Sequence, residues 1–585
     1  MVPYPITSVV AVAILMTGVA SSWLSTPVLA SDPGRNVGRS ESLAAERPAG
    51  NPFVAKVAAG GNTNLFHLTP EQLALADRRG RLAWLDYPAT DTTLGAPYDS
   101  INRLYGTLGR RPLVRRGLQR RGLSGIGRNW SHVFRQAGLI NFPREEGAGA
   151  YFVPFPGNRR PSTPMGFTVF RSPQNERLFT MSCAACHTRN LFGRPVLGGS
   201  NLHGGTGNTM LLLKRVSQLS SRQFRFATRP DCGEARAFYE LQRKMSRVQG
   251  KRSQAMGLEN PVAFVGLSMW NRAAGNRDAA NRSVHRSTNR STLHNIATDT
   301  KPPVLWNLKY KNRFQHDGSM TGDPILANLI FNEIGRGSDL KALSRWIDRS
   351  RETLRDMAAA AYAMQAPRWT DFFAAETIDL EQAKRGEIVF NQRCARCHGA
   401  YEKAWSRENA TTSNVADLLR TVKVTMPSIT TAEDVGTDPG RSRTMLELAP
   451  LANRLSIFKD NQISFRANPG AYVPPPLVGI WARWPYMHNN SIPNLDELLK
   501  PAAERVTTYY VAEAIDIRRD YDARAVGFKV GPRTPQLWRT PARLFDTRRP
   551  GLANTGHDEG IFVEDGVNQL SPEDKSDLIE FLKTL

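Results

Sequence analysis

Two short motifs constrain the fold of this 585-residue chain more than any other feature of its sequence. Both have the spacing C-x-x-C-H, and their cysteines and histidines are Cys183, Cys186, His187, Cys394, Cys397 and His398. This spacing is the attachment signal for c-type haem: the thiols form thioethers to the porphyrin, and the histidine becomes the proximal iron ligand. A redox C-x-x-C pair needs no following histidine, and a zinc site needs a second ligand pair, which neither place supplies. The motifs therefore predict two covalently bound haems.

The segments that follow the two motifs are similar to each other. Each motif is followed, about a hundred residues on, by prolines, a tryptophan and a turn with an aromatic residue and a histidine. These features are residues 302–303, Trp306 and 314–317 in the first copy, and 474–476, Trp481 and 486–489 in the second. We therefore predict a mainly α fold with two tandem class-I-like cytochrome c domains and extensive loops. The expected boundaries are 161–375 and 376–585, after an N-terminal region of unknown role at 31–160.

Two helices are predicted from local patterns in the second domain. Residues 379–390 place Leu380, Ala383, Ile388 and Phe390 at apolar positions just before Cys394. At the C-terminus, Ser571 is a good N-cap, and a proline and acidic residues follow it in the first turn. The apolar stripe of that last helix consists of Leu578, Ile579, Leu582 and Leu585.

The first 30 residues are typical of a secretory signal peptide. An apolar run at 9–16 is followed by an A-x-A-like pattern that ends at Ala30. No Lys or Arg precedes the apolar run, so an uncleaved N-terminal anchor is the alternative. No stretch of 18 apolar residues follows, and we expect no membrane span in the mature chain. The expected location is therefore periplasmic or secreted.

The chain is strongly basic, with 77 Lys and Arg against 53 Asp and Glu and a formal net charge of +24. This balance excludes an acidic, calcium-buffer-like protein. Arginine pairs at 110–111, 115–116 and 120–121 form the densest basic stretch, but no zinc-finger spacing or other nucleic-acid signature accompanies them. A solvated basic face is therefore favoured, and no nucleic-acid partner is expected. Arginines near the haems would also neutralise propionates.

Part of the chain resembles a known group of proteins. Residues 479–481, 485–488 and 491–495 are similar to a Pro-Tyr-x-His-(Asp/Asn)-Gly-Ser-x-Pro-Thr-Leu segment of the bacterial di-haem cytochrome c peroxidase superfamily, with Asn490 where Gly is usual. The tail, with residues 545–547, 550–551, 554–557 and the last helix, looks more like the rubber-oxygenase branch. The resemblance covers roughly residues 160 to 585.

The resemblance implies one haem with an open position for peroxide and a six-coordinate haem that supplies an electron. Peroxidase catalysis in that superfamily relies on a Gln and a Glu near the open site, whose positions here hold Phe314 and Pro324. Cleavage of the O–O bond needs a group that takes and returns a proton, which neither residue can do. The replacement of the peroxidase Gln and Glu by these two residues favours an oxygenase-like site with an apolar distal pocket. Asp323, beside Pro324, is the remaining acid–base candidate.

Other histidines are candidates for the sixth ligands. The resemblance places His557 on the second haem, and Met487 or His488 is the alternative. His203 either closes the first haem reversibly or is an ordinary surface histidine. His316 and His488 stand in matching turns, and we favour hydrogen bonds to haem propionates for both.

Three further expectations concern single features. Resembling proteins carry a tryptophan between the two haems at the position of Trp306, where an oxidisable ring relays an electron; core packing is the alternative. Calcium between the haem domains is also implied by the resemblance, although no ligand set can be assigned. Cys232 remains as a free or buried thiol.

The leading interpretation is a haem-dependent oxidoreductase. It would activate dioxygen or hydrogen peroxide at the first haem, with electrons passing through the second, and its other partner would be an organic substrate or a redox protein. The alternatives are a di-haem cytochrome c peroxidase proper, a non-catalytic electron carrier and a haem-bearing interaction protein. Two small haem domains need far fewer residues than this chain has, which argues against a simple carrier.

Overall fold

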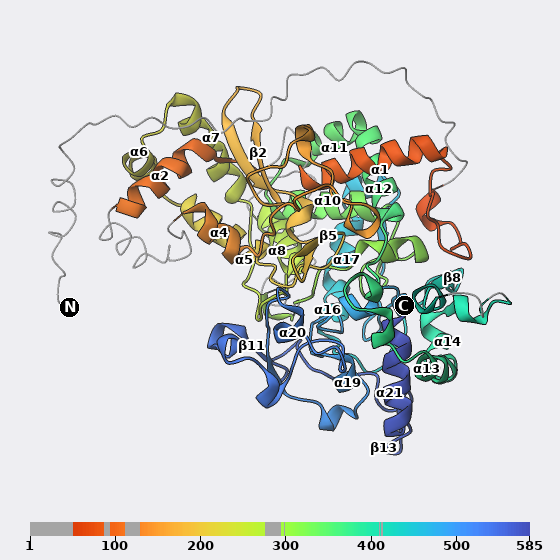
Figure 1. Ribbon diagram of the computed structural model, residues 1–585. Helices are drawn as coiled ribbons and strands as arrows, with labels where there is room; N and C mark the ends of the chain where they lie inside the picture. Colours follow the sequence, from red (N-terminus) through yellow and green to blue (C-terminus); the bar gives the residue numbers. More distant parts are fainter. Residues whose placement is uncertain are drawn as a thin grey trace. The chain divides into compact units, whose positions relative to one another are not determined.

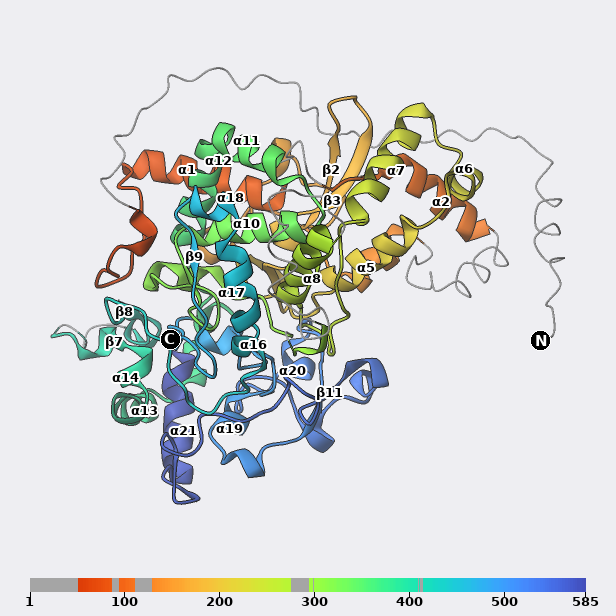
Figure 2. The same ribbon diagram turned by 180° about the vertical axis from the view of Figure 1, so that it is seen from behind.

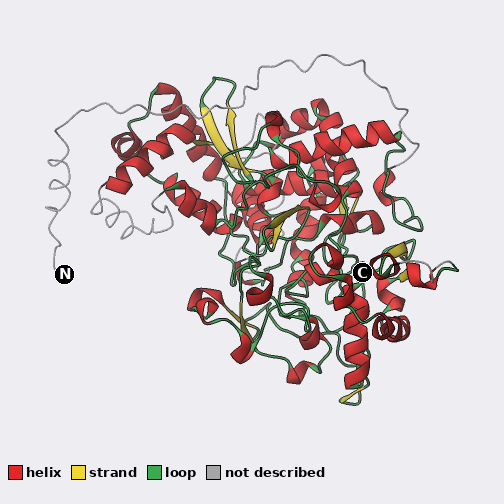
Figure 3. Ribbon diagram, viewed as in Figure 1, coloured by secondary structure: helices red, strands yellow, loops and turns green. Residues whose placement is uncertain are grey.

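Helices account for more of the fold than strands do, as the sequence predicts (Figure 3). The structure is a computed structural model that describes residues 51–86, 94–110, 129–274, 294–297, 299–408, 410 and 414–585. The signal-peptide segment 1–30 and the arginine pairs beyond Arg110 lie outside these ranges. The α-helices are α1 (Pro70–Leu85), α2 (Tyr98–Arg110), α4 (Trp130–Gln136), α5 (Thr206–Val216), α6 (Ser221–Thr228), α7 (Cys232–Met245), α8 (Pro261–Ala274), α10 (Pro324–Gly335), α11 (Leu340–Arg349), α12 (Arg351–Ala363), α13 (Leu380–Arg393), α14 (Ala395–His398), α15 (Val415–Leu418), α16 (Gly440–Arg443), α17 (Met445–Asn453), α18 (Ser456–Lys459), α19 (Leu495–Leu498), α20 (Ile517–Asp520) and α21 (Pro572–Lys583).

The strands are short and form small antiparallel sheets. They are β1 (Ala96–Pro97), β2 (Phe167–Arg171), β3 (Arg177–Met181), β4 (Thr188–Leu191), β5 (Arg194–Leu197), β6 (Met320–Thr321), β7 (Ala400–Lys403), β8 (Thr421–Thr425), β9 (Ser464–Phe465), β10 (Thr508–Tyr510), β11 (Leu544–Asp546), β12 (Val563–Glu564) and β13 (Val567–Asn568). The largest sheet has the order β1-β3-β2, with Phe167 opposite Met181. The pair β6–β9 places Met320 opposite Phe465, so it joins two segments that are far apart in the chain.

Both predicted helices of the second half are confirmed. Asp379 caps α13 by accepting a hydrogen bond from the Gln382 N–H, and Ser571 forms a capping box at the start of α21. The apolar stripe of α21 is buried as expected. One position of α13 differs, because Ile388 is 59% exposed. Gly386 faces α21 instead: a Cβ at this residue would come within 1.9 Å of the Asp577 carbonyl oxygen.

The described part of the N-terminal region packs against the first haem motif. Helix α1 lies along α12 in both views (Figures 1 and 2) and also contacts the 3-10 helix η7 (Cys183–Ala185). Strand β1 extends the sheet whose strand β3 ends just before Cys183. Helix α1 and strand β1 therefore contribute directly to the surroundings of the motif.

The two matching loops repeat in three dimensions. Phe314 bridges Met320 and Tyr486 bridges Ile492, each across a tight turn. The spacing between the two copies is 172 residues, which is also the separation between Trp306 and Val478. Trp481 is therefore not the counterpart of Trp306, contrary to the expected tryptophan repeat. The Trp306 indole N–H instead donates to Val478 O, the residue at its own matching position.

Reciprocal hydrogen bonds join the two loops. Lys301 N–H donates to His488 O at 2.8 Å, and the matching Val473 N–H donates to His316 O at 2.8 Å. Such reciprocity is the pattern of a two-fold-related interface. The described residues from 51 onward belong to one compact unit, and one cluster of buried apolar side chains extends from Phe53 to Leu585. Among the described residues, no helix is long and apolar enough to cross a membrane.

Candidate haem sites

The two motif histidines have the same hydrogen-bonded environment. His187 Nδ1–H donates to Pro303 O at 3.1 Å, and His398 Nδ1–H donates to Pro475 O at 2.8 Å. Each bond orients the ring and leaves Nε2 as the free nitrogen, which is how proteins prepare a histidine for a metal. Burial lowers the pKa of both imidazoles to about 4, so they are neutral at physiological pH. Both histidines thus meet the requirements of a proximal haem ligand.

The motif cysteines are suited to covalent attachment. All five cysteines of the chain are free thiols, and both motifs lie on a helical turn, in η7 and α14. Burial raises the pKa of the Cys183 thiol to about 11, and of the Cys186 and Cys394 thiols to about 12. A reactive redox cysteine has a lowered pKa, so these environments do not favour disulfide exchange. Cys232 is exposed at the start of α7.

His557 faces His398. Their ring centroids are 6.1 Å apart and the ring planes differ by 22°. An imidazole nitrogen lies about 2 Å from a bound metal, so two rings on opposite sides of one ion have centroids about 6 Å apart. His557 Nδ1 is buried and has no hydrogen-bond partner among the described residues, and burial lowers its pKa to about 3. The pair therefore fits a haem iron held from both sides.

A rigid loop holds His557 in place. The Arg505 guanidinium donates to the carbonyl oxygens of Asn554, Gly556 and His557. Gly556 has a φ of +93°, and a Cβ there would come within 2.6 Å of Thr437 Oγ1. Only glycine adopts this backbone without strain, so the residue before His557 sets the path of the loop.

The first motif has a different neighbour. The Trp84 ring of α1 packs edge-on against His187, with centroids 5.7 Å apart and planes at 87°. Within the described ranges no histidine ring pairs with His187. His203 Nε2 bonds Ala512 O at 3.2 Å, and its Nδ1 lies 3.5 Å from a Glu513 carboxylate oxygen. Both nitrogens of His203 are engaged, which does not favour iron ligation.

Phe314 and Asp323 lie on either side of the tight turn. Phe314 is buried, and its N–H donates to Met320 O at 2.8 Å. Asp323 is the N-cap of α10: its Oδ1 accepts from the N–H groups of Ile325 and Leu326 at 2.8 and 3.1 Å. Pro324 is the first residue of that helix, a position where proline is favoured. Local helix geometry therefore accounts for both the Asp and the Pro.

A continuous path connects the two proximal histidines through Trp306. Trp306 is 1% exposed and lies three residues after Pro303, the partner of His187. Its Nε1–H donates at 3.0 Å to Val478 O, three residues after Pro475, the partner of His398. The indole thus lies between the two proximal loops and is also part of the core, and its relay role stays a prediction.

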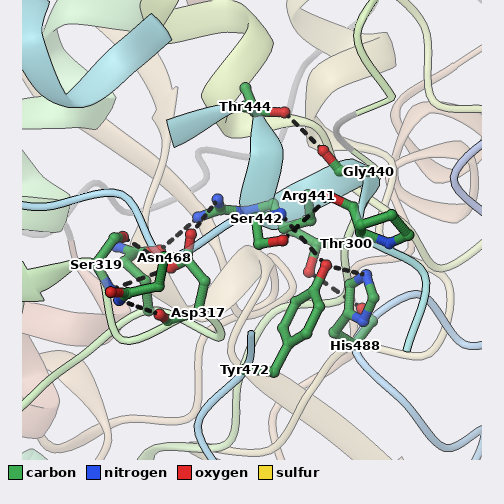
Figure 4. Close-up of polar contacts among 12 residues, drawn as sticks. Thr300, Asp317, Ser319, Gly440, Arg441, Ser442, Thr444, Asn468, Tyr472 and His488 are labelled. Carbon is green, nitrogen blue, oxygen red and sulfur yellow. Dashed lines mark hydrogen bonds and ion pairs between the residues drawn. The ribbon is translucent and has the colours of Figure 1, made fainter. Parts of the chain in front are cut away.

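The matching turns meet in a buried polar network (Figure 4). His488 stacks on Tyr472 with ring centroids 4.3 Å apart, and its Nε2 lies 3.2 Å from the Tyr472 hydroxyl. The Asp317 carboxylate pairs with Arg441 at 3.1 Å, and both side chains are almost fully buried. His316 Nε2 contacts Lys301 O at 3.0 Å. In both histidines Nε2 is thus already engaged with a protein group.

Sequence reasoning missed several residues of these sites. Trp84 precedes the first motif by a hundred positions, and Arg505 and Tyr472 belong to no motif. Four buried or half-buried cations near the motifs were also not assigned: Arg189, Lys301, Lys311 and Arg483. Of these residues, only Arg483 could have been found from the sequence, because it stands three residues before Tyr486 in the second matching loop.

No group of three or more His, Cys, Asp or Glu side chains in the described ranges could hold a metal ion, so no side-chain cluster for calcium emerges there.

Comparisons with known proteins agree with this chemistry. A family model described as "RoxA-like, cytochrome c-like" matches residues 471–510, the segment that contains Pro475 and His488. The uncharacterized protein y4iJ of Sinorhizobium fredii (strain NBRC 101917 / NGR234) is 25% identical over 475 residues, which are 69% of this chain and 76% of that protein. The uncharacterized protein y4iM of the same organism is 26% identical over 343 residues, or 54% and 71%. Over residues 471–510 the chain is thus similar to RoxA-like cytochromes c, which implies covalently bound haem c.

Proposed function

We propose that the chain is an exported c-type cytochrome oxidoreductase with two haems of unequal role. The haem at His187 would activate dioxygen or hydrogen peroxide, and the haem at His398, closed by His557, would exchange electrons with it. The observation that carries the proposal is the asymmetry of the two motifs: a histidine faces His398 at 6.1 Å, whereas Trp84 is the ring beside His187. When bound, haem iron would supply oxidation–reduction chemistry and, at the first motif, a coordination position for the oxidant.

The chain's own residues favour dioxygen over peroxide. Phe314 is apolar and buried, so it offers no proton to a bound oxidant. The Asp323 carboxylate is occupied by two backbone N–H groups. General acid–base catalysis contributes roughly 100- to 10,000-fold to the rate of such steps. Because neither Phe314 nor Asp323 offers a free acid–base group, we expect an oxygenase-like reaction with an organic substrate whose identity the residues do not specify.

Trp306 would connect the two sites. Its buried indole donates a hydrogen bond to the proximal loop of the second motif. Trp306 itself belongs to the proximal loop of the first motif. An electron that leaves the second site therefore has a packed protein path to the first. The Pro303 and Pro475 carbonyls hold the proximal rings in one orientation during this exchange.

The test is the optical spectrum of the purified protein, oxidised and reduced, with and without carbon monoxide. We expect a mass increase of two haems, a low-spin signal, and carbon monoxide binding to one ferrous haem. Peroxide turnover with a dye donor should be weak, and Phe314→Gln combined with Pro324→Glu should raise it, whereas Pro324→Glu alone should not.

Other outcomes select the alternatives. Robust peroxide turnover by the unmodified protein would return it to the di-haem peroxidases, with Asp323 as the acid–base group. Absence of carbon monoxide binding to either ferrous haem would indicate an electron carrier. N-terminal sequencing of the exported chain tests cleavage after Ala30, and an intact N-terminus would instead support an anchor.

A further inference from the structure

Four cationic side chains lie close together, Arg189 buried and the other three half-buried, and none has an acidic partner among the described residues. Arg189, Lys301, Lys311 and Arg483 make no ion pair with any carboxylate among the described residues. Arg189 is 2% exposed, and its Nε and Nη2 have no hydrogen-bond partner. Its guanidinium carbon lies 4.2 Å from the ring centroid of Trp484. A buried charge costs several kcal/mol unless it is paired, so such a group requires an explanation.

Of the other three side chains, Lys301 and Arg483 donate only to backbone carbonyls, and Lys311 has no hydrogen-bond partner among the described residues. Lys301 Nζ donates to Arg483 O at 3.2 Å and to Pro485 O at 2.5 Å, and the Arg483 guanidinium donates to Pro476 O at 2.7 Å. The Lys311 ammonium has no protein acceptor among the described residues. Carbonyl dipoles satisfy donors, but they do not neutralise charge.

The cations also repel one another. Burial lowers the pKa of Lys311 to about 7, that of Arg483 to about 10, and that of Lys301 well below its ordinary value. Arg483 and Arg189 lower the pKa of Lys301 further, and Arg483 does the same to Lys311. The folded chain alone therefore disfavours the charged forms of these side chains, which a bound anion would stabilise.

The cluster lies beside the haem motifs. Arg189 follows His187 by two residues on β4, and Lys301 precedes Pro303 by two. The Arg483 guanidinium donates to Pro476 O, next to the Pro475 carbonyl that orients His398, and Lys311 is a charged neighbour of Arg483. Two of the cations are thus connected with the first motif and two with the second.

We propose that Arg189, Lys301, Lys311 and Arg483 form an anion site beside the motifs that takes the carboxylates of the bound haems. Each haem c carries two propionate groups, so two haems bring as many carboxylates as there are cations. This inference rests on the proposed function, because it requires both motifs to be loaded. It assigns Lys311 and Arg483 to the second haem, and Arg189 and Lys301 to the first.

The reduction potential of each haem in the holoprotein tests the assignment. In Lys311→Met the propionate loses its countercharge, which disfavours adding an electron to the nearby iron. We expect the reduction equilibrium of the second haem to shift at least about tenfold toward the oxidised form, or 59 mV for a one-electron couple. Lys311→Arg keeps the positive charge and should have a potential close to that of the unmodified protein. Arg483→Met should lower the potential of the second haem, as Lys311→Met does.

Lys309→Met is the matched control. Lys309 lies on the 3-10 helix η9 (Leu305–Tyr310), is buried and donates to Met364 O, but its charged neighbours are Arg81 and Asp77 rather than the cluster. Both potentials should stay unchanged in this variant. Unchanged potentials in Lys311→Met and Arg483→Met, with both haems attached, would overturn the assignment.

Two further measurements separate the possible causes of failure. Haem mass and carbon monoxide binding test the proposed function independently of any potential. If the cluster instead holds an exchangeable small anion, the potential of the unmodified protein should change with chloride concentration, and Lys311→Met should remove that dependence. This result would also overturn the assignment to haem carboxylates.

Discussion

His557 faces His398 across a distance that suits one iron, and it lies 159 residues further along the chain. His557→Ala should therefore convert the low-spin signal of the second haem to a high-spin one and allow this haem to bind carbon monoxide. His557→Met should keep six ligands and raise the potential, because Met/His ligation does so in cytochromes. Absorption and electron paramagnetic resonance spectra measure both changes.

His203→Ala is the control, and its spectrum should match that of the unmodified protein. If His557→Ala leaves the spectrum unchanged, Met487 becomes the next candidate.

At the scale of elements, the first turn of α10 sets the behaviour of Asp323. Burial raises the pKa of this carboxyl from 3.8 to about 6, although its two N–H partners oppose the shift. A raised folded-state pKa gives stability that is present below about pH 4 and lost as the pH rises through about 6. Asp323→Asn keeps the cap without the buried charge. We expect it to be more stable than the unmodified protein by about 1–3 kcal/mol at pH 8 and equally stable near pH 4.

Unfolding midpoints at the two pH values measure this difference. Asp323→Ala is the contrasting variant: it loses the cap and should be less stable than Asp323→Asn by about 1 kcal/mol at both pH values. A proton-transfer role for Asp323 would appear separately, as loss of residual peroxide turnover in Asp323→Asn. Equal stability of the unmodified protein and Asp323→Asn at pH 8 would show that the carboxylate is not penalised in the folded chain.

At the scale of the whole molecule, contacts between the two matching loops join the two halves of the chain. Helix α16 adds to these contacts, because its Arg441 forms an ion pair with Asp317 of the first loop, with the two side chains 2% and 0% exposed (Figure 4). Removing one partner of a buried pair leaves an uncompensated charge and costs about 3–5 kcal/mol. Arg441→Met should therefore destabilise the fold by about that amount, and adding Asp317→Leu should recover most of it. Denaturant unfolding of the two single variants and the double variant gives the coupling energy. Additive losses would show that the pair does not couple the halves.

The sequence alone determined the features that depend on neighbouring residues. The spacing of Cys394, Cys397 and His398 specifies haem attachment because all the reacting groups lie within one helical turn. Asp379 and Ser571 specify helix starts because a cap acts on N–H groups two or three residues away. The repeated turns at 314–320 and 486–492 could be recognised in the sequence because two turns with the same backbone geometry require similar residues.

Only the tertiary structure decided which distant groups meet. It placed Trp84 beside His187, paired Trp306 with Val478 rather than with a matching tryptophan, and turned Ile388 to the solvent where Gly386 allows α21 to approach. It also brought the four cations of the proposed anion site together, with no acidic partner among the described residues. These outcomes depend on long-range packing and on burial, which no local spacing encodes, because burial is a property of everything that surrounds a residue. The sequence predicts where haem would be attached, whereas the tertiary structure decides which side chains surround the two motifs.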